Sequence, residues 1–68
     1  MRVSDIPRNN VKAALAFIDQ EFDAGRPLDG DTWSILLQLQ DDDRAFTKAA
    51  IDHVDARVKA GRKVPGGE

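Results

Sequence analysis

The sequence contains no cysteine and only one histidine. The absence of cysteine excludes disulfide bonds, thiol nucleophiles, iron–sulfur clusters and thiolate zinc sites, and it is typical of a protein from a reducing compartment. No apolar run approaches the ~18 residues of a membrane-spanning helix, and the first five residues lack the apolar core of a signal peptide. We therefore expect a cytoplasmic protein.

The chain is short, and its composition is that of a globular protein. It has 68 residues, of which 41% are hydrophobic and 32% charged, so it is too apolar for a generic disordered chain. A domain of this size buries only about 60% of its unfolded surface, and small cores are commonly supplemented by an oligomeric contact. We expect one domain over residues 1–61.

Charge is unevenly distributed along the chain, although the net charge is only −2. Residues 19–43 carry eight acidic residues and one arginine, for a net charge of −7. Residues 1–18 and 44–68 are basic, with net charges of +2 and +3. An acidic centre repels phosphate and can steer a basic partner, but it does not determine the fold.

The hydrophobic pattern predicts an all-α fold, a compact bundle of three helices near residues 7–24, 31–40 and 43–60. Gly25 and Gly61 are suited to the left-handed conformation that ends a helix, and they fix the ends of the first and third helices. The segment 62–68 has too little apolar content to pack, which predicts a flexible C-terminal tail.

The three helices carry more apolar surface than short helices readily bury in one bundle. Phe17 lies well off the main apolar stripe of the first helix, and the second helix is apolar around most of its circumference. The third helix has a second, alanine-rich face that includes His53. This excess predicts an interaction surface or a homodimer, unless the second helix lies in the middle of the bundle and is covered within one chain.

The segment Asp29–Trp33 resembles the start of a calcium-binding loop only in its two acidic residues. Trp33 and Ser34 occupy the fifth and sixth loop positions, and Gln40 stands where a bidentate glutamate is required. Helix capping by Asp29 is the better interpretation, and it places Leu28 and Trp33 at the two positions of a hydrophobic staple.

Asp41, Asp42 and Asp43 have two interpretations. They can form a solvated helix start, where carboxylates complement the positive end of the helix dipole. They can also bind a cation, or imitate nucleic-acid phosphates toward a basic protein, if the other acidic residues share their surface. We favour the helix start. His53 has no cysteine or second histidine as a partner, so we interpret it as a packing or interface histidine.

Neither an enzyme nor a helix-turn-helix protein is expected from this sequence. It has no glycine-rich phosphate loop and no nucleophile beside a base, and a small bundle leaves little room for a concave pocket. A DNA-reading helix that began with three aspartates would repel phosphate.

The leading hypothesis is a helical protein–protein interaction module, such as a regulator, inhibitor or accessory subunit. The alternative is a nucleic-acid-associated regulator that uses the basic terminal segments. We assign no catalytic residue, metal site, cofactor, membrane contact or small-molecule substrate. The candidate partner-binding residues are Phe17, Trp33, Leu37, Asp41, Asp42, Asp43 and His53.

Overall fold

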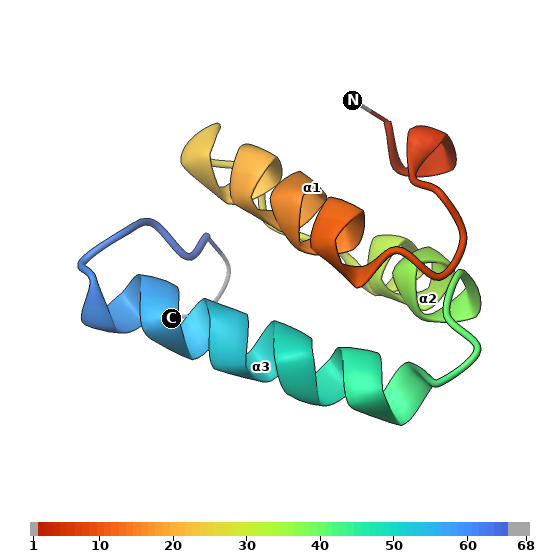
Figure 1. The fold of residues 1–68 in the computed structure, drawn as a ribbon. Coiled ribbons are helices and arrows are strands. Elements are labelled where there is room, and N and C mark those ends of the chain that lie inside the picture. Colours follow the sequence, from red (N-terminus) through yellow and green to blue (C-terminus); the bar gives the residue numbers. More distant parts are fainter. Residues whose placement is uncertain (1, 66–68) are drawn as a thin grey trace.

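The computed structural model describes residues 2–65, and over this range it contains three α-helices preceded by a short 3-10 turn (Figure 1). The turn η1 is Val3–Asp5, and the helices α1, α2 and α3 are Val11–Asp23, Gly30–Gln38 and Asp43–Lys59. In Figure 1, α3 runs below α1, and α2 lies behind them on the side where α3 begins. The predicted all-α bundle of three helices is confirmed.

Each α-helix begins after a residue whose side chain caps it, and α1 and α3 each end before a glycine. A side-chain oxygen at the N-cap accepts a hydrogen bond from a backbone N–H of the first turn, which would otherwise lack a partner. Gly25 and Gly61 have φ angles of +79° and +72°, as predicted for the residues that end α1 and α3. The capping residues with their donors are Asn10 with Ala13 (3.0 Å), Asp29 with Thr32 (2.8 Å) and Asp42 with Ala45 (3.1 Å).

The first helix begins later than the predicted residue 7. Asn9 has a left-handed φ of +56°, which no helical residue adopts, and Asn10 then caps the helix at Val11. The backbone N–H of Asn9 donates to the carbonyl of Leu39 at 2.8 Å, so residues 7–10 connect η1 to α1 across the end of α2. The proline at position 7 therefore lies in this connection, not in a first helical turn.

The core is formed by apolar side chains from η1's flank and from all three helices. Phe17 is only 3% exposed and belongs to this core, so the expectation that it lies on an exposed flank is wrong. Ile6 and Leu36, which lie outside α1, belong to the same buried cluster as Phe17. The buried face of α1 is therefore wider than the apolar stripe that its own sequence shows. The buried apolar residues are Ile6, Ala14, Phe17, Ile18, Phe22, Leu36, Phe46 and Ala50.

The segment that follows α3 packs against the bundle over residues 62–65, in contrast with the predicted flexible tail. The carbonyl of Lys63 accepts hydrogen bonds from Arg57, and Val64 packs against the core cluster. These contacts come from one apolar side chain and one backbone carbonyl, which the low apolar content of the segment did not suggest. The rest of the predicted tail, residues 66–68, lies outside the described residues.

Candidate functional site

An apolar groove with a volume of about 590 Å³ lies between α2 and α3. Trp33 and Leu37 line it from α2, and Ile51, Val54 and Val58 line it from α3. Phe46, Thr47, Ala50 and Asp55 complete the lining, so Asp55 is its one charged residue. Two helices packed side by side leave such a groove where no third helix covers their seam.

The rotation of α3 about its axis explains why the groove is apolar. Phe46, Ala50, Ile51, Val54 and Val58 follow one another along α3 at helical spacing, but only Phe46 and Ala50 are buried. Ile51 and Val58 are 63% and 58% exposed, whereas Arg57, one residue before Val58, is 3% exposed. The helix therefore turns a charged side chain inward and a row of aliphatic side chains toward solvent.

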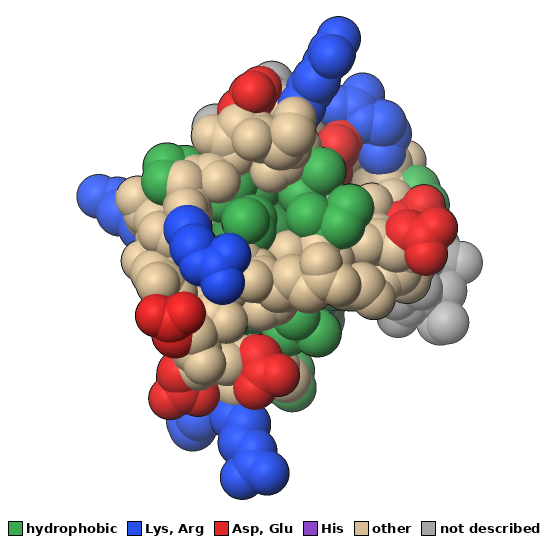
Figure 2. Space-filling view, turned by 90° about the vertical axis from the view of Figure 1, so that its right-hand side faces the viewer, with side chains coloured by type: hydrophobic (Ala, Val, Ile, Leu, Met, Phe, Trp, Pro, Cys, Tyr) green, Lys and Arg blue, Asp and Glu red, His purple; other side chains and the backbone are tan. Residues whose placement is uncertain are grey.

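Exposed aliphatic side chains are concentrated at this groove. Among residues 2–65, the large hydrophobic side chains classed as exposed are Ile35, Ile51 and Val58, and two of these three line the groove. Figure 2 shows one face of the molecule, on which hydrophobic side chains gather in the middle and charged side chains lie around them. A row of exposed aliphatic residues beside a tryptophan is a feature of interaction surfaces.

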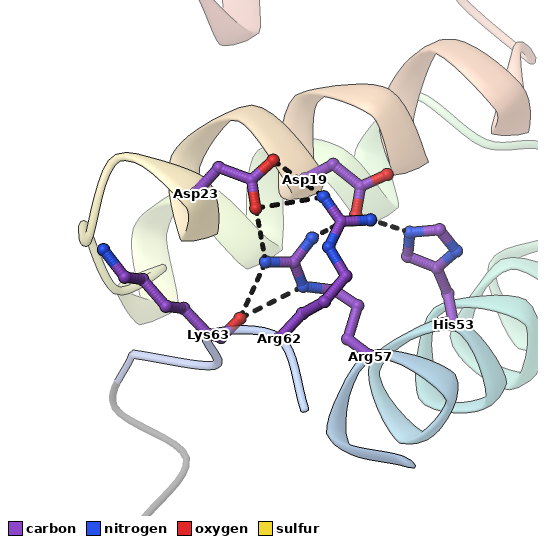
Figure 3. A network of polar contacts seen from close by, with 6 residues as sticks. All are labelled: Asp19, Asp23, His53, Arg57, Arg62 and Lys63. Atoms are coloured by element: carbon purple, nitrogen blue, oxygen red, sulfur yellow. Dashed lines mark hydrogen bonds and ion pairs between the residues drawn. The ribbon is translucent and has the colours of Figure 1, made fainter. Parts of the chain in front are cut away.

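Arg57 is the centre of a polar network that joins α1, α3 and the segment after α3 (Figure 3). Its Nη1 donates to Asp19 and its Nη2 donates to Asp23, both at 2.8 Å. Its Nε and Nη2 also donate to the carbonyl of Lys63 at 3.1 and 2.7 Å. The guanidinium carbon lies 5.5 Å from the centre of the Phe22 ring, so the buried cation is also in contact with an aromatic face.

The two carboxylates of the network are held in their charged form. Partial burial alone would raise the pKa of Asp19, but hydrogen bonds from His53 and Arg57 and the positive charge beside it outweigh this effect, so the pKa is lowered. The hydrogen bond from Arg57 is the main cause of the lowered pKa of Asp23, which also pairs with Arg62 at 2.9 Å. The same carboxylates raise the pKa of Arg57.

The structure brings together only part of the predicted partner-binding set. Trp33 and Leu37 lie in the groove, and Phe17 lies in the core. His53 is part of the polar network, because its Nε2 lies 2.9 Å from an oxygen of Asp19.

The three aspartates at residues 41–43 each have a place at the start of α3, in agreement with the helix-start interpretation. Asp42 is the N-cap and Asp43 is the first helical residue. The side chain of Asp41 accepts from Asn9 at 2.8 Å, and its backbone N–H donates back to the Asn9 side chain at 2.7 Å. Two of the basic residues at the other end of α3, Arg57 and Arg62, are paired with carboxylates of α1.

The polar network of Arg57 and the groove were not predicted, although the network has a recognisable pattern in the sequence. Asp19 and Asp23 are four residues apart on α1, and His53 and Arg57 are four residues apart on α3. Such spacing places each pair on one helix face, so two acids on one helix matched two bases on its neighbour. The groove had no comparable signal, because Ile51 and Val58 have the same residue types and spacing as buried core positions.

Comparisons with known proteins give no family for this chain. No protein-family model matches it, and neither the curated proteins nor the solved structures include a significant match. Over residues 2–65, no helix has the length and apolar character needed to cross a membrane.

Proposed function

We propose that this chain is a small helical protein–protein interaction module that binds an amphipathic helix in the groove between α2 and α3. A regulator, inhibitor or accessory subunit would act in this way, by occupying or presenting a surface. The observation that carries the proposal is the exposure of Ile51 and Val58, at 63% and 58%, beside Trp33. Its expected compartment is the cytoplasm, because the chain has no cysteine.

A helix is the occupant that fits the shape of this groove. The groove runs along two packed helices, and a further helix laid into it extends the bundle with the same side-chain packing. An amphipathic helix would place apolar residues at i, i+3, i+4 and i+7 against Trp33, Leu37 and Val54. Covering the aliphatic row removes it from water, which is the main favourable contribution to such binding.

The test is selection of helical peptides on the folded protein. A displayed library of amphipathic helical peptides is selected on the wild-type chain, and each binder is then measured against Ile51→Asp. We expect binders with apolar residues at helical spacing that shift the fluorescence of Trp33 and lose at least ~10-fold in affinity on Ile51→Asp. Ile35→Asp is the matched control, because Ile35 is 40% exposed on α2 and lies outside the groove.

The proposal fails if the library yields no binder, or if the binders are as sensitive to Ile35→Asp as to Ile51→Asp. In either case the groove would be a solvated depression without a binding role. Circular dichroism of both variants confirms that a lost affinity does not arise from unfolding.

A further inference from the structure

We infer that the helix bound in the groove is α3 of a second copy of this chain, packed antiparallel to the first α3 about a two-fold axis. This inference rests on the proposed function, because it names the occupant of the same groove. Three observations lead to it: the spacing of the exposed row on α3, the distribution of charge along α3, and the positions of Lys48 and Asp55.

The exposed row of α3 has the spacing of a helix-pairing seam. Thr47, Ile51, Val54 and Val58 follow one another at intervals of four, three and four residues, which is the a/d spacing of a coiled coil. All four residues also line the groove. The helix that forms one wall of the groove therefore carries the kind of stripe that the groove accepts. A two-fold pairing satisfies both copies at once, because each α3 enters the groove of the other.

The charges at the two ends of α3 select the antiparallel direction. The helix is preceded and begun by the exposed residues Asp41, Asp42 and Asp43, followed by one arginine, Arg44. The exposed Lys59 and Lys63 lie at and just after its end, beside Arg62, which pairs with Asp23. Parallel pairing would place like charges beside each other at both ends. Antiparallel pairing places the acidic start of one copy beside the basic end of the other, and it also opposes the two helix dipoles favourably.

Lys48 and Asp55 fix the register within this direction. With Ile51 opposite Val54 of the second copy, and Thr47 opposite its Val58, the two-fold axis passes midway between residues 52 and 53 of α3. Lys48 and Asp55 are seven residues apart and lie on the same side of the seam. Lys48 of one copy then lies close to Asp55 of the second copy, and this contact occurs twice.

The contacts that Lys48 and Asp55 make within one chain do not prevent this exchange. Lys48 pairs with Asp52 at 3.5 Å and Asp55 pairs with Lys59 at 2.9 Å, and all four side chains are more than half exposed. Exposed pairs of this kind contribute about 0–1 kcal/mol, so replacing them with pairs between copies costs little. The seam comprises only four residues from each copy, so self-association is expected at concentrations on the order of micromolar or above.

Sedimentation velocity of the wild-type chain, from about 10 µM to about 1 mM, tests the self-association directly. We expect the average mass to rise toward that of a dimer for the wild type and for Ile35→Asp. Ile51→Asp is expected to remain monomeric. Circular dichroism checks that this variant is folded, as expected for a residue that is 63% exposed. A wild-type monomer at the highest concentration overturns the inference.

Charge reversal tests the antiparallel register. Lys48→Asp places two aspartates together in the proposed dimer, and Asp55→Lys places two lysines together, so each variant alone is expected to dimerise about 10-fold more weakly. An equimolar mixture restores opposite charges at both contacts, and the double reversal restores them within one sequence. Both should recover wild-type dimerisation. A dimer that neither the mixture nor the double reversal restores has a different register, and the inference is then wrong.

The peptide selection described above separates this inference from the proposed function. Helical peptides that bind the groove of a monomeric wild-type chain retain the interaction role and assign the groove to a different protein. If the chain neither dimerises nor selects peptides, both proposals are wrong.

Discussion

Replacing Arg57 by alanine is expected to destabilise the fold by about 2–3 kcal/mol. Arg57 is 3% exposed and donates to Asp19, to Asp23 and to the carbonyl of Lys63. Removal of one partner of a buried ion pair commonly costs about 3–5 kcal/mol, because the other charge remains buried. Here the carboxylates of Asp19 and Asp23 are 30% and 50% exposed and can be rehydrated, so we place the loss below that range.

The loss is large for a domain of this size. At roughly 0.05–0.15 kcal/mol per residue, the whole chain is stabilised by only several kcal/mol. A loss of about 2–3 kcal/mol corresponds to a decrease in Tm of roughly 10–20 °C in a domain of 60–100 residues. Urea unfolding followed by circular dichroism gives the free energy, and a thermal scan gives the Tm.

Lys59→Ala is the matched control for this variant. Lys59 lies two residues further along α3 and pairs with Asp55 at 2.9 Å, but its side chain is 76% exposed. Its loss is expected to cost no more than ~0.5 kcal/mol. If Arg57→Ala costs as little as Lys59→Ala, the network of Arg57 contributes no more than a surface ion pair, and the reasoning about its burial is refuted.

Three further predictions concern stability and use the same unfolding assay. Deleting residues 62–68 should lower the Tm by several degrees, because Arg57 loses its carbonyl acceptor and the core loses Val64; an unchanged Tm would show that this segment does not hold the fold. The pKa values of Asp19 and Asp23 are lowered in the folded state, so their stabilisation is fully present above the unfolded pKa of about 3.9 and is lost as the pH falls below it. The urea concentration at the unfolding midpoint should therefore decrease as the pH is lowered from ~5 to ~2. The decrease should be smaller in Asp19→Asn. Asp42→Ala should lower the free energy of unfolding by about 1 kcal/mol, because the N-cap of α3 is lost. Asn10→Asp is the control, because aspartate keeps an oxygen that can cap α1. A comparable loss of stability in this control would contradict the role given to the caps.

Local sequence signals were sufficient for the class of fold, for the ends of α1 and α3 and for the start of α2. Gly25 and Gly61 end their helices in the left-handed conformation, and Asp29 caps α2, because these effects depend only on residues within one turn. The start of α1 was placed too early because Pro7 is equally compatible with a first helical turn and with an extended connection. The left-handed Asn9, whose side chain is bonded to Asp41, decides between them through a contact across 32 residues.

The burial of individual side chains required knowledge of how the helices pack. Phe17 lies 100° from Ile18 around the helix, and a stripe drawn on one helix leaves it outside. Residues of η1's flank and of α2 join the core beside it, which no pattern within α1 can indicate. The groove was missed for the same reason, since Ile51 and Val58 differ from core residues only in what faces them.

The polar network and the apolar groove are two consequences of one rotation of α3. In the observed orientation Arg57 lies on the same face of α3 as the buried Phe46 and Ala50, whereas Val58, 100° further around the axis, is exposed. The observed orientation buries Arg57 against Asp19, Asp23 and the ring of Phe22. A buried ion pair is by itself weak evidence for stability, and this orientation leaves the aliphatic row of α3 exposed to water, which is a cost. Covering that row with a second helix removes the cost, which is why the groove, and not the charged network, is the surface where we place the function.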